Sequence, residues 1–289
     1  MRGAISDDRP YCVSCFADWW NIKGPIHMSL SARKTRSTSI SLLRNARIGL
    51  TPSRNDIAEG THTSHGSIGM SNTNKEAQKF SDGFHFLPGY LDETSQIALT
   101  LDVGRLFEKA PLFEQRMPRT GAPLSVRMSN AGDYGWVTDR EKGYRYQRTH
   151  PVTGEAWPAI AERLLKLWSD LTRERQPPNL CLINFYSDDA KLGLHQDRGD
   201  SSLDAPVVSI SLGDDATFLL GGLSRKDATR RLSLHSGDVV WFGGASRLIF
   251  HGVQGIKSGT SRLLDRIGLP NGRINLTLRR IDHRPTSDA

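Results

Sequence analysis

The chain has few cysteines, no long apolar stretch and no internal repeat, and each absence excludes a class of protein. Three cysteines in 289 residues cannot form the disulfide framework of a small secreted module, so we expect a reducing compartment, the cytoplasm. No run of about 18 apolar residues occurs, which predicts a protein without a membrane span. The remaining composition, 37% hydrophobic and 24% charged residues, is typical of a globular protein, which we expect to be a monomer.

Acidic residues are scarce in the first quarter of the chain. Residues 1–75 contain ten Lys or Arg against five Asp or Glu, whereas residues 76–289 contain 28 against 26. The formal net charge of +7 therefore does not by itself predict a DNA clamp. The basic segment resembles a transit peptide, but the early Asp residues and Trp19-Trp20 favour a disordered tail or sequence upstream of the true start codon. We predict a disordered basic segment over 1–78, one domain over 79–282 and a C-terminal tail over 283–289.

Two helices and then a series of short strands are predicted in the central part of the chain. Asp92 is placed to cap a helix that runs to about Lys109, and a second helix is predicted from about Pro158 to Arg173. Later apolar runs alternate with Gly-rich turns. Strands are predicted over 180–186, 206–212, 217–220, 231–234, 238–242, 248–251 and 273–281. This pattern predicts a mainly β fold with flanking helices, a double-stranded β-helix or jelly roll.

Three residues form a candidate metal site. His195 and Asp197 are separated by Gln196, and His251 follows 56 residues after the first histidine. Two imidazoles and one carboxylate on one face of an octahedral ion leave three positions open, the arrangement of non-haem iron(II) oxygenases. In a strand, alternation would turn His195 and Asp197 to one face and Gln196 to the other. The HxD pattern alone also occurs by chance, and a lone histidine is more often a surface or core residue than a ligand.

A second pattern lies near the end of the predicted domain. Arg273, Asn275, Thr277 and Arg279 would share one face of a strand, opposite an apolar face. Alone, this stripe is better explained by the hydrated face of an antiparallel edge strand. In a chain that also contains a candidate iron site, the same stripe is explained as a co-substrate site, because two guanidinium groups can bind a small dicarboxylate.

Several motifs in this order resemble one family. The segments are Asn184–Tyr186, Lys191–Asp197, Ser209–Gly213, His235–Trp241, Ser246–Gly252 and Arg273–Arg279, with weaker similarity back to Met128–Asn130, Gly135-Trp136 and Ala156–Ala159. Over about residues 85–281 the chain resembles the AlkB family of iron(II)/2-oxoglutarate-dependent dioxygenases, most of all its bacterial DNA-repair members. The resemblance implies Fe(II), 2-oxoglutarate and O2. It also implies oxidative demethylation of bases such as 1-methyladenine and 3-methylcytosine in single-stranded DNA, with RNA left open. The methyl group is then lost as formaldehyde, and 2-oxoglutarate becomes succinate.

The resemblance also implies roles for individual residues. The implied iron ligands, which are the catalytic residues, are His195, Asp197 and His251. The implied 2-oxoglutarate contacts are Asn184, Tyr186, Arg273, Asn275 and Arg279, and which arginine binds which carboxylate is left open. The residues that would hold the damaged base and the flanking backbone are Trp136, Tyr144, Tyr146 and Arg225.

The local chemistry around the implied base-binding residues agrees with this role. Residues 116–148 contain seven Lys or Arg against three Asp or Glu, interleaved with aromatic side chains that can stack on an unpaired base. The alternative, that these aromatics fill the core, weighs most for Tyr134 and Tyr146. The chain departs from the family at Gly199, where the repair enzymes carry an acidic residue. Asp200 follows, so the preferred base is left open, and one extra residue lies between Trp136 and Tyr144.

Two other functions remain open at this stage. An oxygenase of the same fold could act on protein or lipid instead of nucleic acid. A non-catalytic nucleic-acid-binding protein could use the metal only for structure, but a structural zinc site usually has four protein ligands. His235 is the conceivable fourth ligand, although its place before Gly237 favours a turn.

Overall fold

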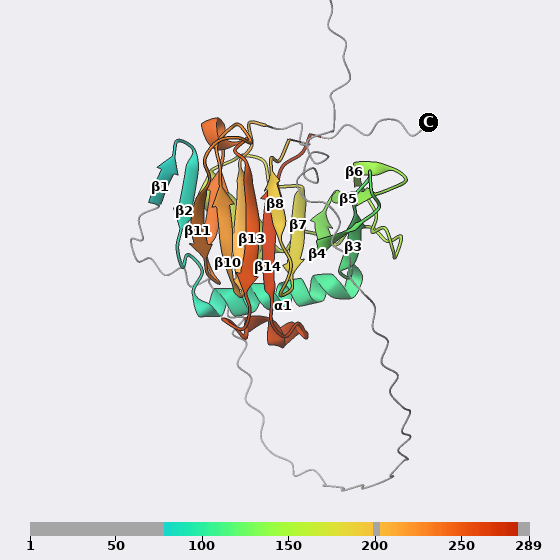
Figure 1. The fold of residues 1–289 in the computed structure, drawn as a ribbon. Coiled ribbons are helices and arrows are strands. Elements are labelled where there is room, and N and C mark those ends of the chain that lie inside the picture. Colours follow the sequence, from blue (N-terminus) through green and yellow to red (C-terminus); the bar gives the residue numbers. More distant parts are fainter. Residues whose placement is uncertain (1–77, 199–202, 283–289) are drawn as a thin grey trace, which may run out of the picture. The chain divides into compact units, whose positions relative to one another are not determined.

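Two antiparallel sheets face each other, with helices on the outer side of the larger one (Figure 1). The computed structural model describes residues 78–198 and 203–282. The predicted basic segment up to residue 77, Gly199 and Asp200, and the predicted tail over 283–289 lie outside the described residues. The arrangement confirms the predicted mainly β jelly roll with flanking helices.

The larger sheet has eight strands. In spatial order they are β1 (Gln78–Ser81), β2 (Phe84–Leu87), β12 (Val239–Phe242), β9 (Val207–Gly213), β14 (Arg273–Arg279), β7 (Leu180–Tyr186), β4 (Pro123–Gly132) and β3 (Phe113–Arg116). The smaller sheet has four strands, β11 (Arg230–Leu234), β10 (Asp215–Leu220), β13 (His251–Lys257) and β8 (Leu192–His195). A separate hairpin of β5 (Gly135–Asp139) and β6 (Gly143–Gln147) lies beside β3 and β4 (Figure 1).

The two α-helices begin for different reasons. Helix α1 (Glu93–Lys109) starts at the predicted cap, where the Asp92 carboxylate accepts a hydrogen bond from the backbone N–H of Ser95 at 2.7 Å. Helix α2 (Glu162–Thr172) starts four residues later than predicted. The carbonyl of Pro158 accepts a hydrogen bond from the N–H of Gly132 in β4, so the chain is still tied to the sheet where the helix was expected.

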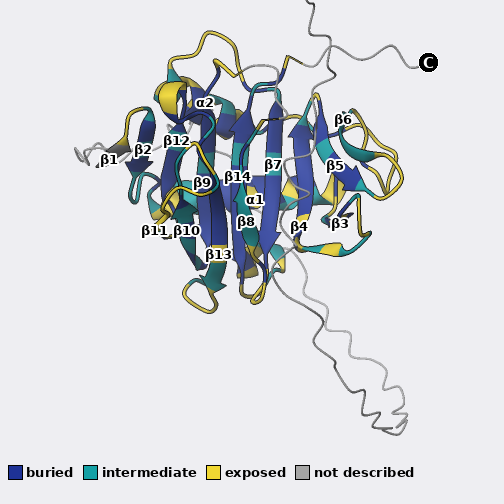
Figure 2. Ribbon diagram, turned by 45° about the horizontal axis from the view of Figure 1, so that its top comes forward, coloured by how far each residue is buried: buried dark blue, intermediate teal, exposed yellow. Residues whose placement is uncertain are grey.

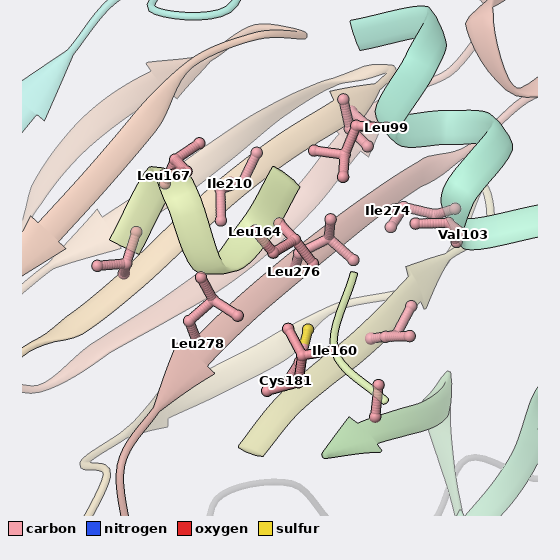
Figure 3. Close-up of a cluster of buried hydrophobic side chains, with 14 of the residues drawn as sticks. Leu99, Val103, Ile160, Leu164, Leu167, Cys181, Ile210, Ile274, Leu276 and Leu278 are labelled. Carbon is pink, nitrogen blue, oxygen red and sulfur yellow. The ribbon is translucent and has the colours of Figure 1, made fainter. Parts of the chain in front are cut away.

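The strands of the larger sheet alternate between an apolar and a polar face. Ile274, Leu276 and Leu278 of β14 pack with the apolar sides of α1 and α2 in one buried cluster (Figure 3). The alternate residues of β14, from Arg273 to Arg279, therefore face the interior between the two sheets. The predicted division of this strand into a polar and an apolar face is confirmed.

A second buried cluster joins the two sheets. Phe84, Tyr186 and Phe242 come from the larger sheet, and Phe218 and Val253 come from the smaller one. Strands at the centre of the larger sheet are buried along most of their length, whereas exposed residues concentrate in loops (Figure 2). Within the described residues, the structure contains no helix long and apolar enough to cross a bilayer.

One predicted strand was placed wrongly. Strand β13 begins at His251, the residue at which the predicted strand over 248–251 was to end. A short 3-10 helix, η2 (Gly244–Ser246), precedes it, and the Ile249 N–H donates to the carbonyl of Ser246. The apolar residues in this stretch are buried in a turn, and apolar character alone does not distinguish a buried turn from a strand.

Candidate metal and co-substrate site

The three candidate ligands meet at one edge of the smaller sheet. His195 is the last residue of β8, His251 is the first residue of β13, and the two lie directly opposite each other in the antiparallel register. The Nε2 atoms of His195 and His251 lie 3.9 and 3.8 Å from the two carboxylate oxygens of Asp197. One ligand atom from each residue falls within 4.8 Å of the others, close enough to share an ion.

The route by which Asp197 reaches the site differs from the predicted one. Strand β8 ends at His195, so alternation along a strand does not bring the two residues together. The chain turns instead, with the Arg198 N–H donating to the carbonyl of Gln196 at 3.0 Å. The buried Gln196 side chain donates to the carbonyl of Leu248 and fixes this turn beside η2.

Both histidines present the nitrogen that a metal requires. The Nδ1 atoms of His195 and His251 lie 2.9 and 3.1 Å from the carbonyl oxygens of Gly193 and Ile249. A carbonyl only accepts, so each Nδ1 carries the proton and each Nε2 keeps its lone pair on the side of Asp197. Burial, together with the neighbouring His195, lowers the pKa of His251 to about 4, which keeps this ring in the neutral, metal-binding form.

Asp197 is held as a carboxylate. Burial alone would raise its pKa, but the Arg279 guanidinium and the two histidines outweigh burial, so the pKa lies well below the usual range. Nη1 of Arg279 lies 3.2 Å from Oδ1 of Asp197. Two neutral imidazoles and one carboxylate with open directions match the donor set of a ferrous oxygenase site.

The polar face of β14 contains a buried cation with open hydrogen-bond donors. The buried Arg273 donates through Nη2 to Ser211 at 2.9 Å, but its Nε and Nη1 have no hydrogen-bond partner within the described part of the chain. Beside it the Asn184 side chain donates to Asn275 at 3.2 Å. The side-chain amide oxygen of Asn184 is also without a hydrogen-bond partner within the described part of the chain. Burying such groups is costly unless a partner completes them. A carboxylate fits the two open N–H groups of Arg273.

The two arginines of β14 occupy opposite ends of the strand. Arg273 lies opposite Tyr186 in β7, with its guanidinium 5.5 Å from the centre of that ring, and burial raises the pKa of Tyr186 to about 12. Arg279, at the other end, contacts the metal-ligand candidate Asp197. A dicarboxylate between the two sheets would therefore have a cation near the metal position and another farther from it.

Two of the predicted base-binding residues form an aromatic pair on the hairpin. The rings of Trp136 and Tyr144 stack with centroids 5.7 Å apart and planes at 24°. Trp136 is half-buried and packs against the cluster between the sheets that contains Tyr186. Trp136 lies in strand β5.

The other two predicted base-binding residues have different surroundings. Tyr146 packs against a small cluster of Tyr134, Leu180 and Ile281. Tyr134 is buried there, and Arg148 lies over its ring and donates to its hydroxyl at 2.9 Å. Arg225, in the loop between β10 and β11, lies over the ring of Phe250, which precedes the ligand candidate His251. Arg225 thus lies against the residue that precedes His251, and Tyr146 lies opposite Trp136 in the register of the hairpin.

The conceivable fourth ligand does not reach the site. The exposed His235 pairs with Asp215 at 2.8 Å, and among the described residues the candidate metal group consists of His195, Asp197 and His251. A site with three protein ligands and open directions is typical of a catalytic metal rather than a structural zinc.

One buried residue of the site was missed in the sequence. Arg247 donates through Nη1 to the carbonyl of Asp197 at 3.0 Å and through Nε to the carbonyl of Ala205 at 2.8 Å. It joins both ends of the segment that contains residues 199–202. A charged residue directly before the apolar run Leu248–Phe250 was the available signal, but these two acceptors are backbone atoms, which leave no sequence pattern.

Comparisons with known proteins agree with this geometry. The family described as the 2OG-Fe(II) oxygenase superfamily matches residues 83–279. The alpha-ketoglutarate-dependent dioxygenase AlkB homolog of Caulobacter vibrioides is 48% identical over 198 residues, 68% of this chain and 87% of the relative. The alpha-ketoglutarate-dependent dioxygenase AlkB of Escherichia coli K12 is 43% identical over 165 residues, 56% of this chain and 76% of the relative. A solved structure of OsALKBH1 superposes with a TM-score of 0.61 at 34% identity, covering 71% of this chain and all of that chain. The chain therefore belongs to the AlkB family of Fe(II)/2-oxoglutarate-dependent dioxygenases.

Proposed function

We propose that this dioxygenase removes alkyl groups from the ring nitrogens of bases in single-stranded DNA, 1-methyladenine and 3-methylcytosine being the first substrates to test. The observation that carries the proposal is the stacked Trp136–Tyr144 pair beside the cluster that lines the space between the sheets. Aromatic faces of this kind bind unpaired bases in single-strand-binding proteins. The similarity to the AlkB dioxygenases of Caulobacter vibrioides and Escherichia coli supports it.

The residues of the buried site would divide the chemistry as follows. His195, Asp197 and His251 would hold iron(II), which when bound supplies O2 activation for oxidative decarboxylation coupled to hydroxylation of an N-alkyl carbon. Arg279 lies beside the position expected for the 2-oxoglutarate carboxylate nearest the metal. Arg273 offers two open N–H donors to the carboxylate farther from the metal. The protein supplies position and exclusion of water rather than acid–base chemistry.

The two Asn side chains and the tyrosine beside Arg273 would complete the co-substrate site. Asn184 offers an open amide oxygen, while Asn275 is fixed by Ser209 at 2.6 Å. The Tyr186 phenol keeps its proton at neutral pH, because burial raises its pKa to about 12, so it can donate a hydrogen bond to a carboxylate.

The substrate base must leave its stack before it can reach the metal. A base alkylated on its pairing edge can carry a positive charge, and the face of Trp136 would favour the charged form over the neutral parent. Arg225, held over Phe250, would contact the backbone on the side of His251. We assign Tyr146 to the same surface, at the base of the hairpin that carries the aromatic pair.

The proposal is tested with short oligonucleotides that each carry one alkylated base. Mass spectrometry after incubation with enzyme, iron(II), ascorbate and 2-oxoglutarate should show loss of the alkyl group with stoichiometric succinate and formaldehyde. DNA and RNA oligonucleotides of one sequence decide between the two polymers. Succinate release without any change in either oligonucleotide would contradict the proposal.

The variant Trp136→Ala separates nucleic acid from protein or lipid as the substrate. We expect loss of oligonucleotide repair while 2-oxoglutarate turnover without oligonucleotide is retained, since the indole lies outside the ligand set. Tyr134→Phe is the matched control, because it keeps a buried ring and removes only the hydroxyl that Arg148 contacts. Repair that is equal in Trp136→Ala and the wild type would favour a substrate other than a base.

We further infer that the enzyme acts in the cytoplasm as a monomer. The described part of the chain contains one free cysteine, the buried Cys181, and burial raises the pKa of its thiol to about 12. A thiol in this form does not pair or oxidise readily. Size-exclusion chromatography with light scattering tests the monomer, and a dimeric mass would contradict it.

A further inference from the structure

The hairpin that carries Trp136 is attached to the larger sheet in an unusual way. Strand β5 pairs with β6 on one side, while its other edge lies against β3 and β4 without joining their ladder. Two amide side chains form the hydrogen bonds that a neighbouring strand would otherwise supply at this edge. Asn130 of β4 and Gln115 of β3 both bind the backbone of Trp136.

All four polar atoms of these two amides are used on the same short segment. Asn130 accepts from the N–H of Trp136 at 3.2 Å and donates to its carbonyl at 3.3 Å. Gln115 donates to that carbonyl at 3.0 Å and accepts from the N–H of Thr138 at 2.8 Å. The exposed fractions of Gln115 and Asn130 are 0% and 1%, so neither amide has water as an alternative partner.

This attachment fixes one residue of the hairpin more firmly than the rest. The Trp136 backbone is bound on both its N–H and its carbonyl, whereas the turn at Arg140–Lys142 is bound only within the hairpin, through the carboxylate of Asp139. Gly135 adds to the restraint, since a side chain there would overlap the Trp157 ring at 2.3 Å. These contacts fix the position of the Trp136 indole relative to the space between the two sheets.

We propose that Gln115 and Asn130 are positioning residues that hold Trp136 for stacking on the substrate base and thereby set the preference for alkylated over unmodified bases. The inference rests on the proposed function of Trp136. Stacking and cation–π attraction both depend on the distance and tilt of the ring, and a displacement of about 1 Å can cost about 100-fold in rate. The hydrogen bonds of both amides go to Trp136 and Thr138 of the hairpin, so their effect is expected on recognition alone.

The test is the isosteric variant Gln115→Glu, which loses the donor to the Trp136 carbonyl and keeps the acceptor for Thr138. We expect the KM for an oligonucleotide with 1-methyladenine to rise about tenfold with kcat little changed. 2-Oxoglutarate turnover without oligonucleotide should stay at the wild-type rate. The ratio of binding constants for methylated and unmodified trinucleotides, measured by fluorescence titration, should fall.

Gln147→Glu is the matched control on the same hairpin. The side chain of Gln147 in β6 bonds instead to Arg145 and to the carbonyl of Thr149. If Gln115→Glu has a lowered melting temperature, Gln115→Met replaces it, because methionine removes the same donor without burying a carboxylate at a position that is 0% exposed.

The outcomes separate this inference from the function on which it rests. A raised KM in Trp136→Ala with a wild-type KM in both Gln115 variants would overturn the positioning role alone. A wild-type KM in all three variants would overturn the base-binding role of Trp136 as well. Equal losses in oligonucleotide repair and in 2-oxoglutarate turnover without oligonucleotide would also overturn the proposal, since they would show a merely structural role.

Discussion

The metal centre and the aromatic hairpin are held in place by different kinds of bond. His195 and His251 sit opposite each other in a backbone ladder, and Arg273 and Arg279 lie in a strand paired on both sides. The hairpin forms a sheet of its own, and side-chain amides join it to the larger sheet.

The difference separates chemistry from recognition. Backbone pairing does not depend on side-chain identity, so substitutions around His195 and His251 can accumulate without moving these two ligands, whereas Asp197 depends on the turn that the Gln196 side chain fixes. Side-chain attachment can be changed by one substitution, which allows the stacking surface to be altered while the metal centre stays intact. The metal-site histidines and strand β14, which are held by backbone pairing, are called the ladder-held region. We expect substitutions to reduce activity most in the ladder-held region and least at the tip of the hairpin.

The strongest test of the ladder-held region is His195→Ala. Loss of outer-shell partners of a metal ligand typically costs about 10- to 100-fold, so loss of the ligand itself should exceed this. We expect iron-dependent succinate release to fall to the level without enzyme. His235→Ala, which removes an exposed histidine that pairs with Asp215, is the matched control. Wild-type succinate release in His195→Ala would refute the ligand assignment.

Arg273→Met should separate co-substrate binding from folding. A hydrogen-bonded charge contributes about 1.5–3 kcal/mol, so the KM for 2-oxoglutarate should rise about 10- to 100-fold. Without co-substrate, however, the melting temperature should stay the same or rise, because the variant removes a buried cation with two open donors. Arg262→Met is the control, since Arg262 is exposed and pairs with Asp265. A marked fall in the melting temperature would show that Arg273 is mainly structural.

The sequence predicted those parts of the site in which a local pattern determines where a side chain lies. Alternation placed Arg273 and Ile274 on opposite faces of a strand, and Asp92 capped α1 through a short-range bond. Both outcomes depend on neighbours within a few residues, which a sequence shows directly. The ligand set itself was recognised through the order of its motifs, and the structure brings its three members together.

Other features depended on contacts between distant segments. Asp197 reaches the metal site after β8 has ended, through a turn fixed by Gln196 and Leu248, 52 residues away in the sequence. Helix α2 is delayed because β4 binds the Pro158 carbonyl. Gln115 lies in no motif, and its partner is the backbone of Trp136. Hydrogen bonds to backbone atoms place no demand on the partner's residue type, so no sequence pattern marks them.

The buried site should also make stability depend on pH. The pKa of His251 is about 4 in the folded state and 6.5 when exposed, so between these values the unfolded chain binds a proton that the folded chain does not. The contribution of the neutral His251 to stability is therefore fully present above pH 6.5. It is lost as the pH falls toward 4, and the free energy of unfolding decreases by up to about 1.4 kcal/mol per pH unit. Urea unfolding of the metal-free protein at pH 7 and pH 5 measures this loss.

The variant His251→Gln assigns that pH dependence to one ring. The difference in unfolding free energy between pH 7 and pH 5 should be smaller in His251→Gln than in the wild type. An unchanged difference in His251→Gln would place the titrating group elsewhere.

The smallest effect is expected at the tip of the hairpin. Arg140 and Lys142 are exposed, and neither has a side-chain partner among the described residues. Arg140 follows the end of β5 and is four residues from Trp136, about 13 Å at about 3.3 Å per residue, so it can reach a phosphate beyond the stacked base. In Arg140→Gln/Lys142→Gln we expect the KM for a ten-nucleotide substrate to rise a few-fold at low salt.

The salt dependence of binding shows whether these cations contact phosphates. Each lost phosphate contact should reduce the slope of log K against log salt by about 0.7 for a single strand, and a trinucleotide should bind as it does to the wild type. Arg262→Gln/Arg266→Gln is the control, because η3 (Leu263–Ile267) packs with α1 on the helix-covered side of the larger sheet. If the tip variant instead lowers 2-oxoglutarate turnover without oligonucleotide, the hairpin and the metal centre are coupled. Recognition and chemistry are then not separable, because a substitution at an exposed turn would have altered the activity of residues held by backbone pairing.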